Sequence, residues 1–162
     1  MTVALPKKAD FLPPGAHVAT PEEIEAAFVH DFKGSTTRAV VFRQWQILNQ
    51  AIQRIIPIEK QWVYGSFVTS KKDPADIDII THFDGAAMDG LEPVDKMLVH
   101  GLISGHYTRD LHGVDSYAIV FYPERHPARE EYVKAINFWD DMLAHQGRKG
   151  EAKGYIEVKL DG

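Results

Sequence analysis

The chain has 162 residues, of which 44% are hydrophobic and 25% charged, values typical of one globular domain with a single core. No apolar run approaches the roughly 18 residues of a membrane span, and the first 11 residues lack the apolar region of a signal peptide. Cysteine is absent, which excludes disulfides, thiolate zinc sites and cysteine nucleophiles. We therefore expect a cytoplasmic protein without a membrane anchor.

The formal net charge of −5 bears on the partners. Proteins that grip long nucleic acids are usually basic on at least one face, because phosphate neutralisation supplies most of the affinity. We therefore expect no extended DNA binding, but a small nucleotide carried with metal, a protein partner, or a nucleic acid contacted locally. The histidines are scattered: His100, His106 and His112 recur every six residues, which fits neither helix nor strand, and we interpret them as surface or loop positions.

The N-terminal part predicts a leader followed by a capped helix. Residues 1–19 read as an extended leader with a turn at Pro13-Pro14-Gly15, and residues 20–162 as a single domain. Thr20 can cap a helix in which Pro21 takes the first position and Glu23 completes a capping box. This helix should run to about Val29.

A longer helix is expected from about Ser35 to Ile56, since its apolar residues recur at spacings of three and four; these are Val41, Trp45, Leu48, Ile52 and Ile55. Pro57 ends this helix. We expect Trp45 to pack in the core together with Trp62 and Trp139, as their apolar neighbours indicate.

The rest of the chain alternates between strand and helix patterns. Short apolar or alternating segments predict four strands, at Trp62–Tyr64, Ile77–Thr81, Ser116–Tyr122 and Tyr155–Leu160. Helices are expected at Pro93–Ile103 and Ala128–His145, and the segment Phe67–Asp73 reads as a loop with at most a turn or two of helix. The pattern predicts a mixed α/β (α+β) fold with a small sheet flanked by helices.

The most informative stretch is Tyr64-Gly65-Ser66, followed after nine residues by Asp76-Ile77-Asp78-Ile79. Two aspartates one residue apart on a strand point to the same face, and two like charges so close repel each other unless cations lie between them. Mg²⁺ prefers such oxygen ligands, and it is commonly held by one or two carboxylates plus substrate phosphates. The glycine allows a phosphate to approach the backbone closely, and the serine can bond it.

An isolated Asp-x-Asp is also common at a solvated strand end. The preceding strand, the Gly-Ser pair and the short spacer favour a site where phosphates meet metal ions, and where displacement occurs in line at phosphorus.

These residues carry a family resemblance. Tyr64-Gly65-Ser66 and Asp76-Ile77-Asp78-Ile79 resemble the signature of the nucleotidyltransferase superfamily, which includes DNA polymerase beta. The whole chain also resembles a family of small bacterial and phage nucleotidyltransferase-like proteins; the likeness includes Phe11–His17, Gly65–Thr69 and Lys153–Glu157. The resemblance implies a minimal nucleotidyltransferase fold, Mg²⁺ or Mn²⁺ as cofactor and a nucleoside triphosphate (NTP) as substrate.

The resemblance also implies a third metal-binding carboxylate on a later strand. Asp115, just before the strand expected at Ser116–Tyr122, is the best match, and Asp110 is the alternative. In such enzymes Asp76 and Asp78 would bind both metals, and Asp115 would help to activate the acceptor hydroxyl.

The sequence defines the residues that would bind phosphate less clearly than the metal-binding aspartates. Gly65, Ser66 and Thr69 belong to the resembling segment, but the Arg-Gly pair that often follows Gly-Ser in minimal nucleotidyltransferases is replaced here. Lys71 or Lys72 could contact the triphosphate, although a solvated pair is the alternative. The basic loop Arg148–Gly154 could close over phosphates or be solvated.

Two functions follow as hypotheses. The first is transfer of a nucleoside monophosphate from an NTP to a hydroxyl on a protein side chain or an RNA end. The second is an antitoxin, immunity or phage regulatory protein that keeps the fold and binds a toxin or other protein partner. Hydrolysis with the same metals is less favoured, because no His or Glu is placed as an obvious base.

Overall fold

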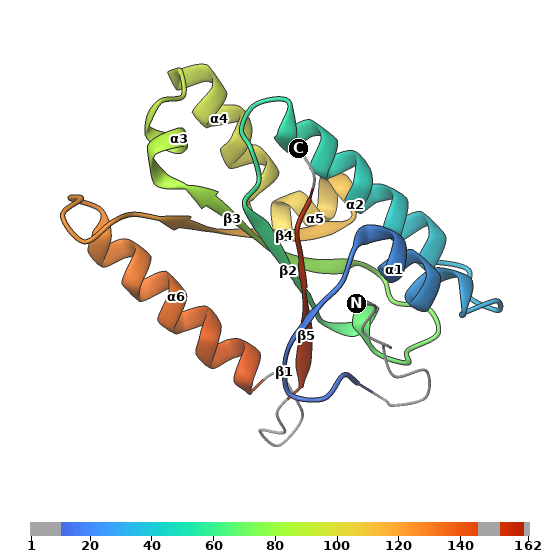
Figure 1. The fold of residues 1–162 in the computed structure, drawn as a ribbon. Helices are drawn as coiled ribbons and strands as arrows, with labels where there is room; N and C mark the ends of the chain where they lie inside the picture. The colour runs from blue at the N-terminus through green and yellow to red at the C-terminus, as the bar shows by residue number, and fades with distance from the viewer. Residues whose placement is uncertain (1–10, 146–152, 161–162) are drawn as a thin grey trace.

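The fold is known from a computed structural model that describes residues 11–145 and 153–160. A five-stranded mixed sheet has the order β1-β5-β2-β3-β4 (Figure 1). The strands are β1 (Gly15–Val18), β2 (Lys60–Tyr64), β3 (Ile77–Asp84), β4 (Val114–Phe121) and β5 (Gly154–Val158). The central pair β2–β3 is antiparallel, whereas β3 and β4 run parallel. This confirms the mixed α/β class.

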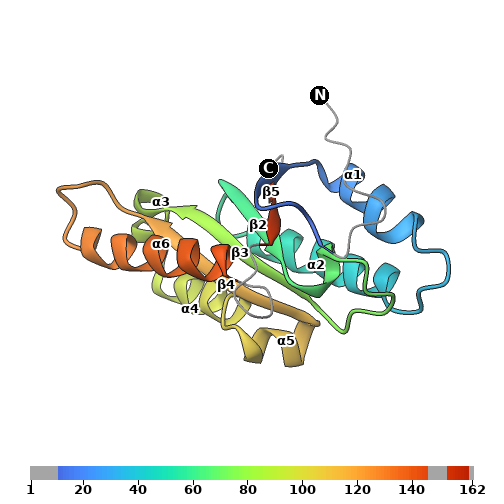
Figure 2. The same cartoon turned by 90° about the horizontal axis from the view of Figure 1, so that it is seen from below.

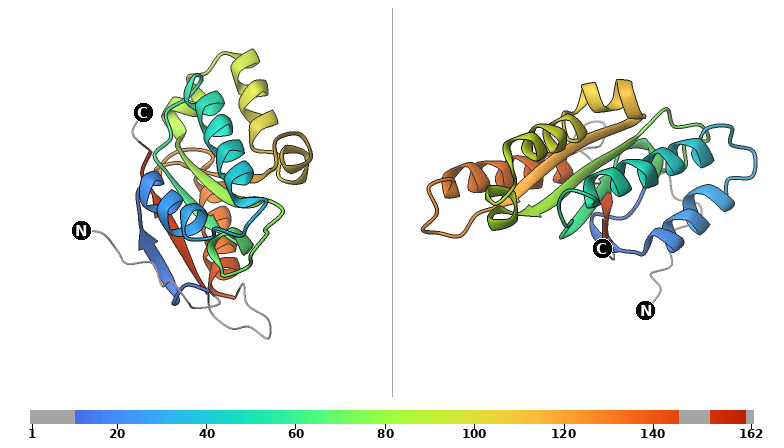
Figure 3. Two further views of the ribbon diagram at one scale, coloured as in Figure 1. Left: turned by 90° about the vertical axis from the view of Figure 1, so that its right-hand side faces the viewer. Right: turned by 90° about the horizontal axis from the view of Figure 1, so that it is seen from above.

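Helices cover both faces of the sheet. They are α1 (Pro21–Glu25), which continues as the π-helical turn η1 (Ala26–His30), then α2 (Arg38–Gln53), the 3₁₀ turn η2 (Ser66–Val68), α3 (Gly85–Asp89), α4 (Pro93–Leu102), α5 (His106–His112) and α6 (Arg129–Ala144). Helix α6 lies along one face (Figure 2), and α2 and α4 lie on the other (Figure 3). Among the described residues, no helix is both long and apolar enough to cross a membrane.

Two buried clusters correspond to these two faces. The larger joins α1, α2 and α4 to the sheet, and Ile77, Ile79 and Val63 belong to it. The smaller joins α6 to Trp62, Ile80 and Ile119. Because side chains alternate along a strand, β3 places odd-numbered residues toward α2 and even-numbered residues toward α6. This parity decides the face on which Asp76 and Asp78 act.

Local sequence rules explain several element ends. The Thr20 hydroxyl accepts a hydrogen bond from the Glu23 backbone N–H at 3.1 Å, which confirms the predicted N-cap. Val41, Trp45, Leu48 and Ile52 are all buried on α2, as are Trp62 and Trp139 in their own elements. The predicted core positions of the tryptophans are therefore confirmed.

Other boundaries differ from the sequence prediction. Strand β3 continues past Thr81 to Asp84, because His82 and Phe83 are buried as well; Asp84 then caps α3 by accepting from the Ala87 N–H. Strand β4 begins at Val114 rather than Ser116, so Asp115 lies inside the strand. Within the expected leader, Gly15–Val18 pairs with β5. His106 and His112 bound the helix α5, which the sequence did not predict.

Candidate active site

Three aspartates converge where β3 and β4 begin. Asp78 is the direct register neighbour of Asp115 across the parallel β3–β4 pair, and Asp76 lies two residues before Asp78 in the segment that leads into β3. On the other side, Tyr64 at the end of β2 is the register partner of Asp78. By strand parity all of these side chains lie on the α6 face of the sheet. Asp115 is buried, with 8% of its surface exposed, and Asp76 and Asp78 are half-buried.

Gly65 makes close packing of the Asp78 carboxylate possible. Its φ of +80° lies in the left-handed region that favours glycine. A Cβ atom built on Gly65 would overlap the Asp78 carboxylate, with Cγ only 2.8 Å away. The backbone that ends β2 therefore lies directly against this carboxylate, and any other residue would push the two apart.

Burial and neighbouring carboxylates raise the pKa values of Asp76 and Asp78. Burial first, then the charges of Asp76 and Asp115, raise the pKa of Asp78 to about 8. Burial and the charge of Asp115 also raise the pKa of Asp76. The nearby basic residues therefore do not fully neutralise the three carboxylates. A bound cation would stabilise such a site, because it would offset their mutual repulsion.

Two basic residues of α5, Arg109 and His106, approach this cluster. Arg109 lowers the pKa values of both Asp76 and Asp78, although less than burial and the carboxylates raise them. His106 Nδ1 lies 3.9 Å from Asp115 Oδ1. Among the described residues, no group donates a hydrogen bond to this buried Oδ1. An acceptor oxygen that is buried and without a donor needs a ligand or water to satisfy it.

The donor set fits Mg²⁺ or Mn²⁺, but the carboxylates do not form a closed cage. The described part of the chain contains no group of three or more His, Asp or Glu side chains that could already hold a metal ion. Mg²⁺ usually keeps several waters and binds one or two carboxylates together with substrate phosphates. An open cluster of oxygen donors, with the orphaned Asp115 Oδ1 among them, suits that mode of binding.

The Gly-Ser turn opens onto a small cavity. Ser66 begins the 3₁₀ turn η2, and the Thr69 hydroxyl donates to the Ser66 carbonyl at 2.7 Å. The cavity has a volume of about 250 Å³ and is lined by Phe11, Gly65, Ser66, Val68, Thr69, Lys153 and Gly154. Three of the residues proposed from the sequence to contact nucleotide, Gly65, Ser66 and Thr69, thus line one cavity. The three aspartates do not line it, and Gly65, which lies against the Asp78 carboxylate, joins the cavity to the cluster.

The structure separates the two candidate lysines. Lys71 is exposed, and its charge lowers the pKa of Asp76. Lys72 instead lies against Gly34, whose Cβ position would be 3.3 Å from Lys72 Cε. Its charge acts on Asp73. Of the pair, Lys71 is therefore the one oriented to help at the carboxylate site.

The two candidates for the third carboxylate are also separated. Asp110 lies on α5, where its exposed carboxylate is 3.8 Å from Arg109 Nε. Asp115 adjoins Asp78 across the sheet. The geometry therefore favours Asp115. The basic loop Arg148–Gly154 lies outside the described residues except for Lys153 and Gly154.

Arg38 is a supporting residue that the sequence did not single out. Its guanidinium is fully buried and donates to the backbone carbonyls of Phe28, Phe67, Thr69 and Lys71. Its planar group also stacks 3.8 Å from the Phe32 ring centroid. Arg38 thus holds the segment that follows Ser66 in place. A charged residue at the start of an otherwise amphipathic helix was the only signal in the sequence.

An aromatic wall borders the carboxylates on the α6 side. The Trp139 ring lies 5.0 Å from Tyr117 and 6.1 Å from Tyr64, measured between centroids. Burial and the neighbouring aspartates raise the pKa of both tyrosines. These hydroxyls therefore stay protonated at neutral pH and can donate hydrogen bonds to the carboxylates.

Fold and site together define a small mixed α/β protein with an open carboxylate cluster beside a Gly-Ser turn. The chain belongs to a family described as a family of unknown function (DUF6932), whose model matches residues 5–159. A comparison with curated proteins found no match, and neither did a comparison with solved structures.

Proposed function

We propose that the protein is a metal-dependent nucleotidyltransferase that moves a nucleoside monophosphate from an NTP to a hydroxyl acceptor. The observation that carries this proposal is the convergence of Asp76, Asp78 and Asp115 next to the Gly65-Ser66 turn. Like-charged carboxylates are costly to hold together without cations, and Mg²⁺ bridges carboxylates to substrate phosphates. The resemblance of these same segments to nucleotidyltransferases supports the proposal independently of the geometry.

Each residue has a role in this proposal. Gly65, Ser66 and Thr69 hold the triphosphate at the Gly-Ser turn, and Lys71, whose charge acts on Asp76, adds a cation. Asp76 and Asp78 hold Mg²⁺ or Mn²⁺, which when bound neutralises the phosphate charge and polarises the phosphorus centre. Asp115 orients the acceptor and takes its proton. The acceptor oxygen then bonds to the α-phosphorus, the bond to the β-phosphate oxygen breaks, and pyrophosphate leaves.

The acceptor is proposed to be a protein side chain or an RNA end. The net charge of −5 favours a protein, because a long RNA held by this chain alone would need a basic surface. A cytoplasmic location, where NTPs and Mg²⁺ are abundant, is part of the same proposal.

Thermal unfolding with each of the four NTPs, with and without Mg²⁺ or Mn²⁺, tests the proposal. A ligand at about 100 times its dissociation constant stabilises by about 2.7 kcal/mol, which is several degrees for a domain of this size. We expect one NTP to raise the unfolding temperature only with metal, and Asp76→Asn/Asp78→Asn to remove that shift. If no NTP stabilises the wild type while the double variant folds equally well, the proposal is wrong.

A protein-binding role is the second candidate, and one observation favours it. Large apolar side chains are exposed on α4 and α5, namely Val94, Met97, Leu98, Tyr107 and Leu111. Exposed apolar clusters of this kind commonly mark protein contacts. An antitoxin, immunity or phage regulatory protein would use such a surface, and the two roles are compatible, because an enzyme can modify the protein it binds.

A further inference from the structure

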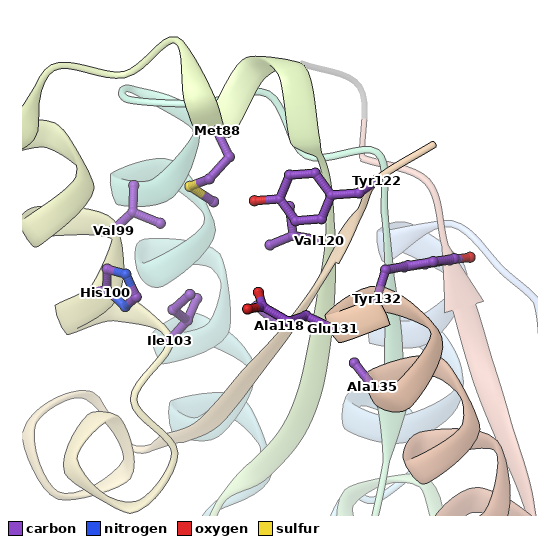
Figure 4. Close-up of a pocket in the computed structure, with 10 residues that line it drawn as sticks. All are labelled: Met88, Val99, His100, Ile103, Ala118, Val120, Tyr122, Glu131, Tyr132 and Ala135. Carbon is purple, nitrogen blue, oxygen red and sulfur yellow. The ribbon is translucent and has the colours of Figure 1, made fainter. Parts of the chain in front are cut away.

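The outer edge of β4 forms the floor of a cavity that is separate from the carboxylate cluster. The cavity has a volume of about 360 Å³ and lies between α4 and α6 (Figure 4). Its first wall comes from α3 and α4, with Met88, Val99 and Ile103. Its second wall comes from α6, with Glu131, Tyr132 and Ala135. Both layers of helices thus flank the free side of the last strand of the sheet.

Backbone geometry shows which residues of β4 face this cavity. The Ser116 carbonyl accepts a hydrogen bond from the Gly105 N–H at 2.8 Å, on the side away from β3. Because the N–H and C=O of one residue point to the same side and alternate residues share that side, the polar backbone groups of Ala118 and Val120 also point outward. Further along, the Tyr122 carbonyl accepts from Arg129 Nη1 at 2.8 Å.

Along this edge the carbonyls of Ser116 and Tyr122 are bonded within the protein, and the backbone groups of Ala118 and Val120 lie between them. Ala118 and Val120 each present one donor and one acceptor, and both residues line the cavity. A strand rises about 3.3 Å per residue, so three residues of an added strand would span this open stretch. A folded second copy fits poorly, since the α4 and α6 that flank its own β4 would meet those of the first copy.

Side-chain parity then gives the chemistry of such a segment. Residues opposite Ala118 and Val120 would point toward the α3/α4 wall, because both of these side chains pack on that side of the sheet. The residue between them, opposite Ile119, would point toward α6, since Ile119 packs with Trp139. The first wall is apolar except for His100, whereas the second carries the exposed carboxylate of Glu131.

Glu131 is the carboxylate that lines this cavity, whereas Arg129 is bound to the Tyr122 carbonyl at its end. Burial raises the pKa of Tyr122, which lines the cavity, and the charges of Asp89 and Glu131 raise it further. Both carboxylates therefore lie close enough to affect a charge inside the cavity. Asp89 is paired with His126 at 2.8 Å, which leaves Glu131 as the carboxylate oriented for an incoming cation. A basic side chain is the complement of such a wall.

We propose that the outer edge of β4 binds an extended segment of a partner protein as an added strand. The segment carries an apolar–basic–apolar triplet. Its two apolar side chains contact Met88, Val99 and Ile103, and its basic side chain pairs with Glu131. Its backbone pairs with Ala118 and Val120, in the mode by which exposed sheet edges recruit peptides.

Fluorescence anisotropy with a labelled Ser-Val-Lys-Val-Ser peptide tests this proposal on the full chain. The matched probe has N-methyl groups on the two valines and the lysine, which removes the strand-pairing donors for either strand direction and keeps the side chains. We expect saturable binding of the first peptide and at least tenfold weaker binding of the second. Equal binding of the two peptides, or none of the first up to about 1 mM, a free energy of about −4.1 kcal/mol, would overturn the proposal.

Two neighbouring glutamates supply a charge test. Glu131→Lys should weaken binding of the lysine peptide about tenfold, and a Ser-Val-Glu-Val-Ser peptide should recover binding to this variant. Glu130→Lys is the matched control, because Glu130 is exposed and paired with Lys134 on the helix surface. Identical behaviour of the two variants would refute the pairing with Glu131.

Ala118→Lys should block the slot and abolish peptide binding. If this variant instead abolishes a concentration-dependent self-association of the wild type, measured by sedimentation, the edge serves a second copy of the chain and the proposal fails. Should the variant not fold, the Glu131 and Glu130 pair decides. Peptide binding by Asp76→Asn/Asp78→Asn should match wild type, which separates this surface from the carboxylate cluster.

Discussion

Replacing Arg38 with methionine should destabilise the fold and loosen the segment that follows the Gly-Ser turn. The guanidinium donates to four backbone carbonyls, including the buried oxygens of Phe28 at 3.0 Å and Phe67 at 2.7 Å. Methionine has a similar length but no donors. The variant therefore leaves these two oxygens buried without a partner.

The magnitude follows from those oxygens. A buried polar group that loses its partner costs about 1–3 kcal/mol, so two of them cost about 2–6 kcal/mol. Part of this loss is offset, because a buried charge is removed as well; burial already lowers the pKa of Arg38 to about 10. We expect a net loss of about 3 kcal/mol, which lowers the unfolding temperature by roughly 6–12 °C for a domain of this size.

Urea and thermal unfolding measure this loss, and amide hydrogen exchange localises it. Thr69 and Lys71, whose carbonyls Arg38 also binds at 2.8 Å and 2.5 Å, should lie in a segment that exchanges faster. Arg38→Lys keeps the charge without the planar fork and should fall between wild type and methionine. Arg43→Met, at an exposed position of the same helix, should change stability by less than about 0.5 kcal/mol. A loss below about 1 kcal/mol for Arg38→Met would refute the reasoning.

Further predictions concern the carboxylates and the turn. The pKa of Asp78 is raised to about 8 in the folded protein from an ordinary value of about 3.9, so folding favours the protonated carboxyl. The contribution of Asp78 to the free energy of unfolding is therefore fully present below about pH 4 and is lost as the pH rises to about 8. At pH 7, about three pH units above the ordinary pKa, the ionisation of Asp78 therefore costs wild type up to about 4 kcal/mol. Metal-free Asp78→Asn should be more stable than wild type by up to this amount, measured by urea unfolding in EDTA; a constant difference from pH 4 to 8 would contradict this. His82, whose pKa burial lowers to about 4, contributes equally to both proteins. Gly65→Ala should lower the free energy of unfolding by about 1–3 kcal/mol. The control Gly101→Ala, with open space around its Cβ position, should raise it by about 0.5–1 kcal/mol. Similar unfolding midpoints for the two variants would argue against the close approach at Gly65.

The parts of the site that the sequence predicted are local ones. Asp76 and Asp78 share a face because strand side chains alternate, and that rule needs no knowledge of the rest of the fold. The turn at Gly65 was likewise indicated by residue type, and its φ of +80° agrees. Thr20 and Pro21 fixed the first helix for the same reason.

The parts that the sequence did not predict depend on pairing between distant segments. Asp115 was named through the family resemblance, with Asp110 as its alternative, but residue patterns alone could not choose between them; Asp115 faces Asp78 because β3 and β4 pair in parallel with that register. The four residues of β1 are too short to show a strand pattern, and they are ordered by pairing with β5. The seven-residue α5 lies between Gly105 and Gly113, which both have positive φ, so its periodicity is too brief to detect. Lys71 and Lys72 are equivalent in sequence, and the fold alone directs Lys72 toward Gly34.

A Mn²⁺ titration followed by electron paramagnetic resonance, with and without each NTP, shows whether the three aspartates bind metal together with nucleotide. We expect an NTP to strengthen Mn²⁺ binding by wild type and Asp78→Asn to weaken it at least tenfold. Asp110→Asn, which removes an exposed carboxylate on α5, should match wild type. Equal Mn²⁺ binding by wild type and Asp78→Asn with every NTP would contradict the proposed carboxylate site.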